Sequence, residues 1–276
     1  MANFDRVQWL TTPDPSTQAA ALRAGEVDWV EQPVMDLVPS LKSDRNLRVE
    51  VMETTGLVGV LRFNHLYPPF DNPAIRRAAL HAVNQKEFMT AVAGEADPGV
   101  INDHVGFFAP SSVYASNAGM DNFSSNPDFA ALRKAVKAAG YNGEKVVFLG
   151  AADVPRITAI CQVGADVLSK IGLNVDYVST DWGTVVQRTT RRQPIADGGW
   201  SIFGSMWGGL DLDNPAGNAL LRGNGNNAWF GWPTLPKLEA LRDQWLQTTD
   251  ASAQKSLAAD IQRQAFQDAP AMPLGL

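Results

Sequence analysis

The chain has 276 residues, with 23 Lys or Arg and 29 Asp or Glu, so its formal net charge is −6 at pH 7. Its 45% hydrophobic content is typical of a globular chain and excludes a disordered one, and the acidic balance disfavours a nucleic-acid partner. A single cysteine, Cys161, excludes an internal disulfide and, with only three scattered histidines, leads us to expect neither a metal nor a cofactor.

The first third of the chain is predicted to contain short strands and helices in alternation. Alternating apolar and polar residues predict strands at 4–10, 27–31, 48–53 and 58–63. Helical spacing predicts helices over 18–23 and 36–42, the first of which Gly25 ends. Residues 271–276 predict a strand at the opposite terminus. Because a strand at each end of a chain is unusual, we interpret the sequence as a piece of a longer protein.

The remainder is predicted to form an α/β unit around one βαβ motif. A buried strand at 145–149, a helix at 155–171 and a strand at 173–178 make up this motif, whose strands should be parallel. Residues 200–207 predict a further strand, and 96–126, rich in Gly, Pro, Ser and Asn, predict a long loop. Other helices are predicted at 74–92, 128–139, 182–190, 238–245 and 253–267. These elements predict an α/β fold with a mixed sheet flanked by helices.

No motif of a catalytic site stands out. The glycine-rich residues 223–225 lack the Lys-Ser pair of a P-loop, and neither G-x-S-x-G nor H-E-x-x-H occurs. Asp211 and Asp213 would point to one face of a strand, where they could act as an acid/base pair or bind a cation. Alternatively, Asp213 or Asn214 caps a helix that begins near Pro215. A hydrolase that uses Asp211 and Asp213 is therefore the alternative function.

Tryptophans gather around these two aspartates. Trp200 is expected to pack in the core. Trp207, Trp229 and Trp232 lie beside glycines and asparagines in irregular chain and are expected to be exposed or to line a cleft. Aromatic walls with one carboxylate predict a site for an amphipathic, amine-bearing small molecule.

An ordered set of short segments resembles the peptide/nickel-type (family 5) extracytoplasmic solute-binding proteins of ABC importers, over essentially the whole chain. The segments are PDPST (13–17), ALRAGEVD (21–28), FN (63–64), PPFDNPAIRRA (68–78), AAGY (138–141), IGLNV (171–175), DW (181–182) and DAPAMPL (268–274). The resemblance implies a non-enzymatic, periplasmic or otherwise extracytoplasmic protein that captures a small solute for the permease subunits in the membrane. We expect it to act as a monomer, and no signal sequence is recognisable in this chain.

The resemblance also implies a two-lobe fold in which this chain is the C-terminal part. Residues 1–63 would be a partial first lobe, 64–268 the second, ligand-binding lobe, and 269–276 a strand that returns to the first lobe. The hinge would lie near 60–64 and 268–271, with the solute held between the lobes. With much of one wall missing, we expect this chain alone to bind its solute poorly.

The resemblance finally implies a ligand contact. Members that bind peptides hold the ligand's α-ammonium with an aspartate in a W-x-x-D-x-x-x-P-like stretch, and counting back from Pro215 places Asp211 there. Counting forward from Trp207 finds one extra residue, which leaves Asp213 as a second candidate. The expected wall is Asp211 or Asp213 with Trp207, Trp229 and Trp232, together with loop residues such as Asn224. The solute could be an oligopeptide or dipeptide, or one of the nickel complexes, sugars and opines that other members bind.

Overall fold

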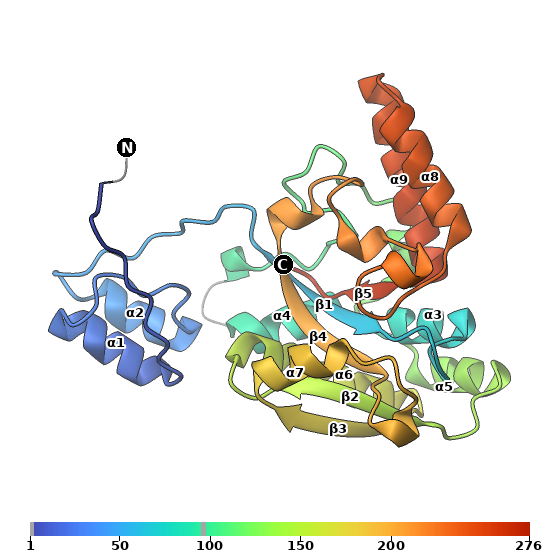
Figure 1. Cartoon of the computed structure of the whole chain (residues 1–276), viewed down its shortest axis with the longest axis horizontal. Helices are drawn as coiled ribbons and strands as arrows, with labels where there is room; N and C mark the ends of the chain where they lie inside the picture. The colour runs from blue at the N-terminus through green and yellow to red at the C-terminus, as the bar shows by residue number, and fades with distance from the viewer. Residues whose placement is uncertain (1–2, 95–97) are drawn as a thin grey trace. The chain divides into compact units, whose positions relative to one another are not determined.

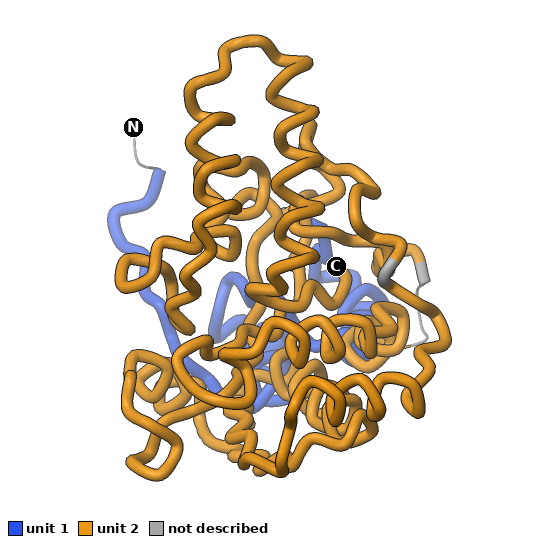
Figure 2. The backbone as a smooth tube through the Cα atoms, turned by 90° about the vertical axis from the view of Figure 1, so that its right-hand side faces the viewer, with its two compact units in different colours: residues 1–52 blue, residues 53–276 orange. Residues whose placement is uncertain are grey.

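A computed structural model describes residues 3–94 and 98–276. The chain divides into two units, residues 1–52 and residues 53–276, which Figure 2 draws in different colours. The second unit contains the β-sheet and the residues predicted to form the site.

The first unit is helical in its described residues. Its elements are α1 (Pro15–Ala24), η1 (Met35–Leu37) and α2 (Val38–Lys42), which confirm the two predicted helices. The predicted strands at 4–10, 27–31 and 48–53 are wrong, because these segments form only bends and irregular chain and pair with no strand. A segment of alternating apolar and polar residues forms a strand only where other strands pair with it and a layer covers its apolar face. Here Phe4, Trp9 and Trp29 remain 77%, 79% and 66% exposed.

The second unit is organised around a five-stranded mixed sheet of order β3-β2-β4-β1-β5 (Figure 1). Its strands are β1 (Leu57–Phe63), β2 (Lys145–Ala151), β3 (Asn174–Thr180), β4 (Ile202–Gly208) and β5 (Ala271–Pro273). β2 runs parallel to β3 and β4, whereas β1 runs antiparallel to β4 and β5. The predicted βαβ motif is confirmed, with α6 (Pro155–Lys170) between β2 and β3.

Opposite faces of the sheet are covered by different helices. α6 packs on one face, so closely that a Cβ atom at Gly204 of β4 would lie 2.3 Å from the Sγ of Cys161. Burial raises the pKa of the Cys161 thiol to about 12, as suits a core cysteine. Because side chains alternate along a strand, Phe203 and Ser205 of β4 face the other side, where α7 (Trp182–Thr189) lies.

The remaining helices and short 3₁₀ turns surround this sheet. They are α3 (Pro73–His81), α4 (Gln85–Ala93), η2 (Pro98–Val100), η3 (Met120–Asn122), α5 (Phe129–Ala138), η4 (Ile195–Asp197), η5 (Gly209–Leu212), η6 (Ala219–Leu221), η7 (Gly225–Asn227), α8 (Pro236–Gln247) and α9 (Ala251–Asp268). α8 and α9 form an antiparallel pair that projects from the sheet in Figure 1. None of the helices in the described residues is long and apolar enough to cross a membrane.

The helix predicted over 74–92 is in fact two helices, α3 and α4. Asn84 interrupts the helical path with an extended backbone (φ −104°, ψ 99°) and becomes the N-cap of α4. Its side-chain amide donates to the carbonyl of Ser125 at 3.0 Å. A tertiary hydrogen bond thus favours a break that the apolar periodicity does not predict. Residues 95–97 lie outside the described residues. Within 98–126, the described part of the predicted loop, the helical or strand elements are the short turns η2 and η3.

The end of the chain returns to the sheet of the second unit. β5 pairs with β1, and the amide of Leu274 donates to the carbonyl of Gly59 at 2.8 Å. The predicted boundary at residue 63 coincides with the end of β1, inside this unit. The assignment of 1–63 and 269–276 to a first lobe stays a prediction.

Candidate functional site

A tight turn after β4 carries Asp211. The amide of Gly209 donates to the carbonyl of Gly56 at 2.9 Å, and a Cβ atom at Gly209 would lie only 2.3 Å from the carbonyl oxygen of Thr55. Glycine is therefore required at 209 for this close approach of two backbone segments. The chain then forms η5, which buries Leu212 and leaves the carboxylate of Asp211 exposed.

Beside this turn lies a cavity of about 350 Å³ between α7 and β4. Its walls come from α7, from the end of β4 and η5, and from the loop before α8. The lining residues are Trp182, Val185, Val186, Thr189, Phe203, Ser205, Met206, Trp207, Asp211, Trp229 and Phe230. These residues include one carboxylate and no Lys, Arg or His, so the cavity combines a broad aromatic surface with a single negative charge.

The aromatic wall is held together by its own ring contacts. Trp207 and Trp229 pack edge to face with centroids 4.8 Å apart, and Trp229 also contacts the rings of Phe203 at 5.4 Å and Phe230 at 5.5 Å. The indole nitrogen of Trp207 donates to the hydroxyl of Ser205 at 3.1 Å. Such offset contacts stabilise the rings in fixed orientations, so the wall is formed before any ligand arrives.

Three of the predicted site residues come together in this cavity, and two do not. Asp211, Trp207 and Trp229 line it, whereas Trp232 is 6% exposed and packs on Trp200, with the guanidinium of Arg192 4.6 Å above its ring. Trp200 is itself buried, as predicted. Trp229 thus differs in role from Trp232, which lies only three residues further along the chain.

Asp213 lies outside the cavity lining because residues 209–212 form a 3₁₀ turn and not a strand. The shared face expected for Asp211 and Asp213 therefore does not exist. The helix expected near Pro215 is also absent, and Asn214 instead closes a turn by accepting from the amides of Ala216 at 3.0 Å and Gly217 at 3.1 Å. Asn224, too, lies outside the lining residues.

The α7 side of the cavity was not predicted, although the sequence carries a signal for it. Four lining residues recur at the spacing i, i+3, i+4, i+7, namely Trp182, Val185, Val186 and Thr189. The cap of this helix is Asp181, whose carboxylate accepts from the amide of Thr184 at 2.9 Å. A stripe of this kind usually packs against a core, and here part of it faces the cavity.

The capping bond makes the stability of this wall depend on pH. The hydroxyl and amide of Thr184 lower the pKa of Asp181 below its ordinary value of 3.8. Because the folded-state pKa is the lower one, the stabilisation is complete above the unfolded pKa and is lost as the pH falls through the folded one. We expect D181N to be less stable than the wild type at about pH 7 and the gap to shrink near pH 3 in urea unfolding experiments. A gap that stays constant over this range would contradict the assignment.

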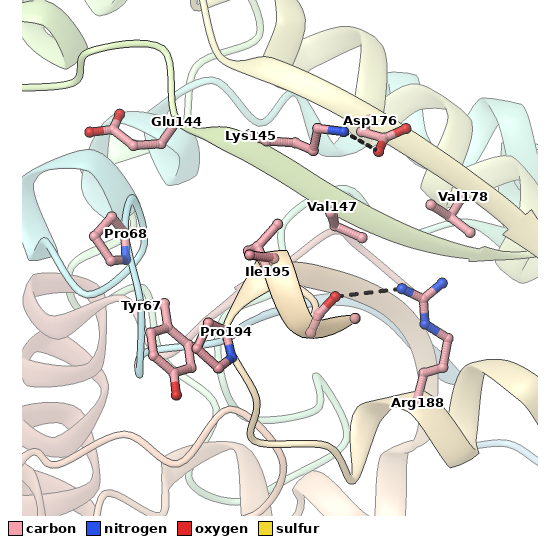
Figure 3. Close-up of a pocket in the computed structure, with 13 residues that line it drawn as sticks. Tyr67, Pro68, Glu144, Lys145, Val147, Asp176, Val178, Arg188, Pro194 and Ile195 are labelled. Carbon is pink, nitrogen blue, oxygen red and sulfur yellow. Dashed lines mark hydrogen bonds and ion pairs between the residues drawn. The ribbon is translucent and has the colours of Figure 1, made fainter.

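A second, larger cavity of about 740 Å³ lies near the start of β2 and beside β3 (Figure 3). Charges of both signs line it, including Glu144, Arg188 and the ion pair of Lys145 with Asp176 at 3.3 Å. None of the predicted site residues lies there. We therefore assign the candidate site to the smaller aromatic cavity.

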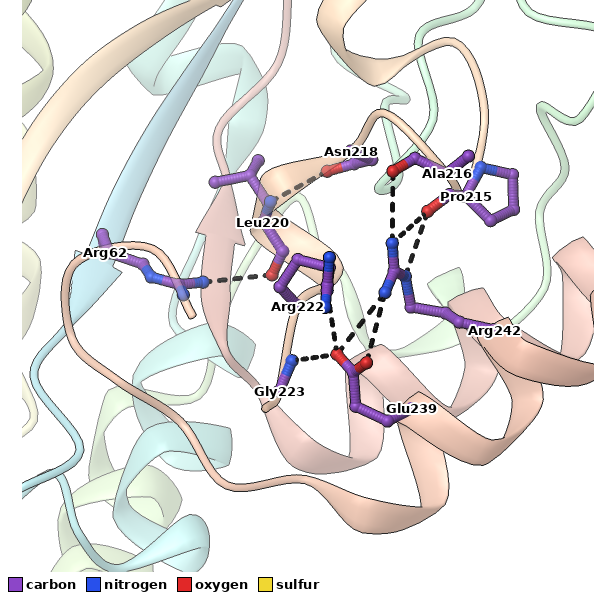
Figure 4. A network of polar contacts seen from close by, with 9 residues as sticks. All are labelled: Arg62, Pro215, Ala216, Asn218, Leu220, Arg222, Gly223, Glu239 and Arg242. Atoms are coloured by element: carbon purple, nitrogen blue, oxygen red, sulfur yellow. Dashed lines mark hydrogen bonds and ion pairs between the residues drawn. The ribbon is translucent and has the colours of Figure 1, made fainter. Parts of the chain in front are cut away.

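A polar network based on α8 fixes the loop between η5 and the aromatic wall (Figure 4). Arg242 of α8, whose side chain is 4% exposed, donates to the carbonyls of Pro215 at 2.6 Å and Ala216 at 3.3 Å. Glu239 pairs with Arg242 at 3.4 Å and accepts from the amide of Gly223 at 2.5 Å. Burial lowers the pKa of Arg242, and Glu239 opposes that shift. Two side chains of α8 thus hold both ends of the segment 215–223.

Comparison with known proteins identifies the family. Residues 1–229 match the family described as bacterial extracellular solute-binding proteins, family 5 Middle. The chain belongs to this family. The resemblance noted in the sequence is thereby confirmed, as is the α/β fold with a mixed sheet flanked by helices.

Three known proteins match along nearly the whole chain. The probable peptide ABC transporter periplasmic-binding protein y4tO of Sinorhizobium fredii is 34% identical over 98% of this chain and 51% of its own length. The solved structure of the ABC transporter substrate-binding protein CtaP from Listeria monocytogenes superposes with a TM-score of 0.77 at 19% identity, covering 96% of this chain and 52% of CtaP. DppA from Helicobacter pylori, in complex with peptide STSA, superposes with a TM-score of 0.73 at 22% identity, over 96% of this chain and 50% of DppA. The chain spans about half the length of the relatives it matches.

Proposed function

We propose that the aromatic cavity is one wall of a binding site for a small peptide-like solute. The observation that carries this proposal is the isolated carboxylate of Asp211 at the edge of a cavity lined by Trp182, Trp207 and Trp229. A ligand ammonium would form a charge-assisted hydrogen bond with Asp211 while its apolar part packs on the rings. The Sinorhizobium relative is a probable peptide ABC transporter periplasmic-binding protein and the Helicobacter structure contains peptide STSA, which supports the same ligand class.

The composition of the wall also limits which end of a peptide it holds. Its lining residues offer the carboxylate of Asp211 and the hydroxyls of Ser205 and Thr189, but no cation. A ligand carboxylate would meet no cation on such a surface and would be repelled by Asp211, whereas an ammonium gains both the ion pair and the negative faces of the rings. We infer that the wall selects the amino end of the solute.

We further propose that the protein is a transport component that does not transform its solute. An acid/base pair requires two carboxylates that reach one substrate, and Asp213 is not among the lining residues beside Asp211. In this proposal a monomeric, extracytoplasmic protein delivers its solute to the permease of an ABC importer. Residues 64–268 supply the second lobe and its wall of the interlobe cleft, and the β1–β5 pair marks the hinge.

Calorimetry with peptides tests the role of Asp211. We expect D211N to weaken binding of Ser-Thr-Ser-Ala about tenfold, and more in low salt, because an amide replaces the ion pair at similar size. The matched control is D213N, which should leave the affinity unchanged. N-acetylated Ser-Thr-Ser-Ala should bind both the wild type and D211N with the same low affinity. Equal affinities of D211N and the wild type for the free peptide would overturn the proposal.

A further inference from the structure

An arginine with no exposed surface contacts two residues of the aromatic wall. Arg62, at 0% exposure, belongs to β1, where it pairs with Phe203 of β4 and Ala271 of β5. Its guanidinium donates to the carbonyls of Phe230 at 2.8 Å, Leu220 at 3.0 Å and Pro270 at 3.3 Å. One side chain thus joins the cavity loop, the turn before it and the strand at the end of the chain.

The same guanidinium faces the ring of a cavity residue. Its central carbon lies 5.4 Å from the centroid of Trp229, within the range of a cation–π contact. The next residues of this loop lie close against β1, since the amide of His65 donates to the carbonyl of Gly231 at 2.9 Å. A Cβ atom at Gly231, where φ is +98°, would lie 2.1 Å from the carbonyl oxygen of Phe63. Glycine there allows the loop to reach Arg62.

This arrangement is unfavourable for the stability of the fold. In the described part of the chain no carboxylate forms an ion pair with Arg62, and its Nη2 atom is buried without a hydrogen-bond partner. Burial, and to a lesser extent the nearby Arg76, lower the pKa of Arg62 to about 9, so the group is still protonated at neutral pH. A buried cation that lacks a counter-ion usually costs more than an apolar side chain of the same size.

We propose that Arg62 is the positioning residue that holds Trp229 and Phe230 in the orientation that receives the solute. This proposal rests on the proposed function of the cavity. The planar guanidinium can bond the carbonyl of Phe230 and face the ring of Trp229 simultaneously, which neither an apolar side chain nor the point charge of lysine can do. Arg62 contacts Trp229 and Phe230 but is not among the residues that line the cavity.

The chain offers a matched control in a second buried arginine. Arg76 of α3 is 3% exposed and donates to the carbonyls of Phe70 at 2.7 Å, Asp268 at 2.8 Å and Ala269 at 3.1 Å. Its burial and bonding resemble those of Arg62, but none of these partners lines the aromatic cavity. Replacing either arginine should lower the stability of the fold, whereas only replacing Arg62 should change the geometry of the wall.

Fluorine NMR of the whole chain labelled with 5-fluorotryptophan distinguishes the two roles. The Trp229 signal is assigned by its disappearance in W229F. We expect R62M to shift and broaden this signal and to weaken binding of Ser-Thr-Ser-Ala about tenfold. R76M should leave both unchanged in the folded protein. R62K keeps the charge but loses the planar fork, so it should shift the signal less than R62M.

The outcomes separate this proposal from the function on which it rests. An unchanged Trp229 signal in folded R62M overturns the positioning role. If R62M does not fold, an unchanged Trp229 signal and an unchanged affinity in R62K overturn it instead. A signal that moves equally in R62M and R76M also overturns it. If the wild type binds no Ser-Thr-Ser-Ala, the cavity of this chain does not by itself hold the proposed solute, and the fluorine spectra still decide whether Arg62 orients Trp229.

Discussion

Replacing Trp229 by alanine should weaken peptide binding about 100-fold. Trp229 is the centre of the wall, because its ring contacts Trp207, Phe203 and Phe230 and covers the guanidinium of Arg62. Aromatic residues at the centre of a desolvated site typically cost 2–4 kcal/mol on truncation, and about 2.7 kcal/mol corresponds to a factor of 100. Titration calorimetry with Ser-Thr-Ser-Ala measures the change.

Two companion variants separate ligand contact from loss of structure. W229F retains a ring that can pack on Trp207 and should lose much less affinity than W229A. W232F changes another tryptophan of the same loop, one that packs on Trp200 outside the cavity, and should bind like the wild type. A W232F variant that loses as much affinity as W229A would place the ligand elsewhere.

Replacing Arg242 by methionine should destabilise the chain by about 3 kcal/mol. The substitution removes the hydrogen bonds to the carbonyls of Pro215 and Ala216 and leaves Glu239 without its buried partner (Figure 4). Breaking a buried charged network costs more than the net value of the pair, because the remaining polar groups stay desolvated. The free energy of unfolding in urea, followed by circular dichroism, is the measurement.

The control for this variant is Arg263 of α9. Arg263 pairs with Asp260 one turn away, but the two side chains are 53% and 46% exposed. An exposed pair of this kind contributes about 0–1 kcal/mol, so R263M should be nearly neutral. Similar losses in R242M and R263M would show that the network in Figure 4 does not hold the loop.

The sequence predicts the second unit well and the first unit poorly, for a physical reason. The strand 145–149 and the helix 155–171 are long, continuous patterns whose burial is satisfied by their immediate neighbours in the chain. The alternating segment 4–10 has a pattern of equal quality, yet it forms no strand among the described residues. A strand depends on partners distant in sequence, and local periodicity contains no information about whether those partners are present.

The candidate site shows the same division between local and tertiary information. Asp211 and Trp207 can be selected from sequence because a carboxylate and an indole beside glycines suggest an exposed turn. The α7 stripe that begins at Trp182 looks the same whether it faces a core or a cavity. The choice between Asp211 and Asp213 depends on a 3₁₀ turn whose formation follows from the contact of Gly209 with Thr55 and Gly56. Arg62 could not be found at all, since its partners are far away in sequence.

The contact of Gly209 with Thr55 and Gly56 has a consequence for where this chain can accept insertions and fusions. Thr55 and Gly56 lie at the start of the second unit, and the carbonyl of Gly56 accepts a hydrogen bond from the amide of Gly209 in the turn that carries Asp211. Adding or deleting one residue at 55–56 would displace the carboxylate as well as the start of β1. A length change between 43 and 52, before this contact, would leave the turn in place. Engineered sensors built from this chain should therefore carry their reporter in that stretch.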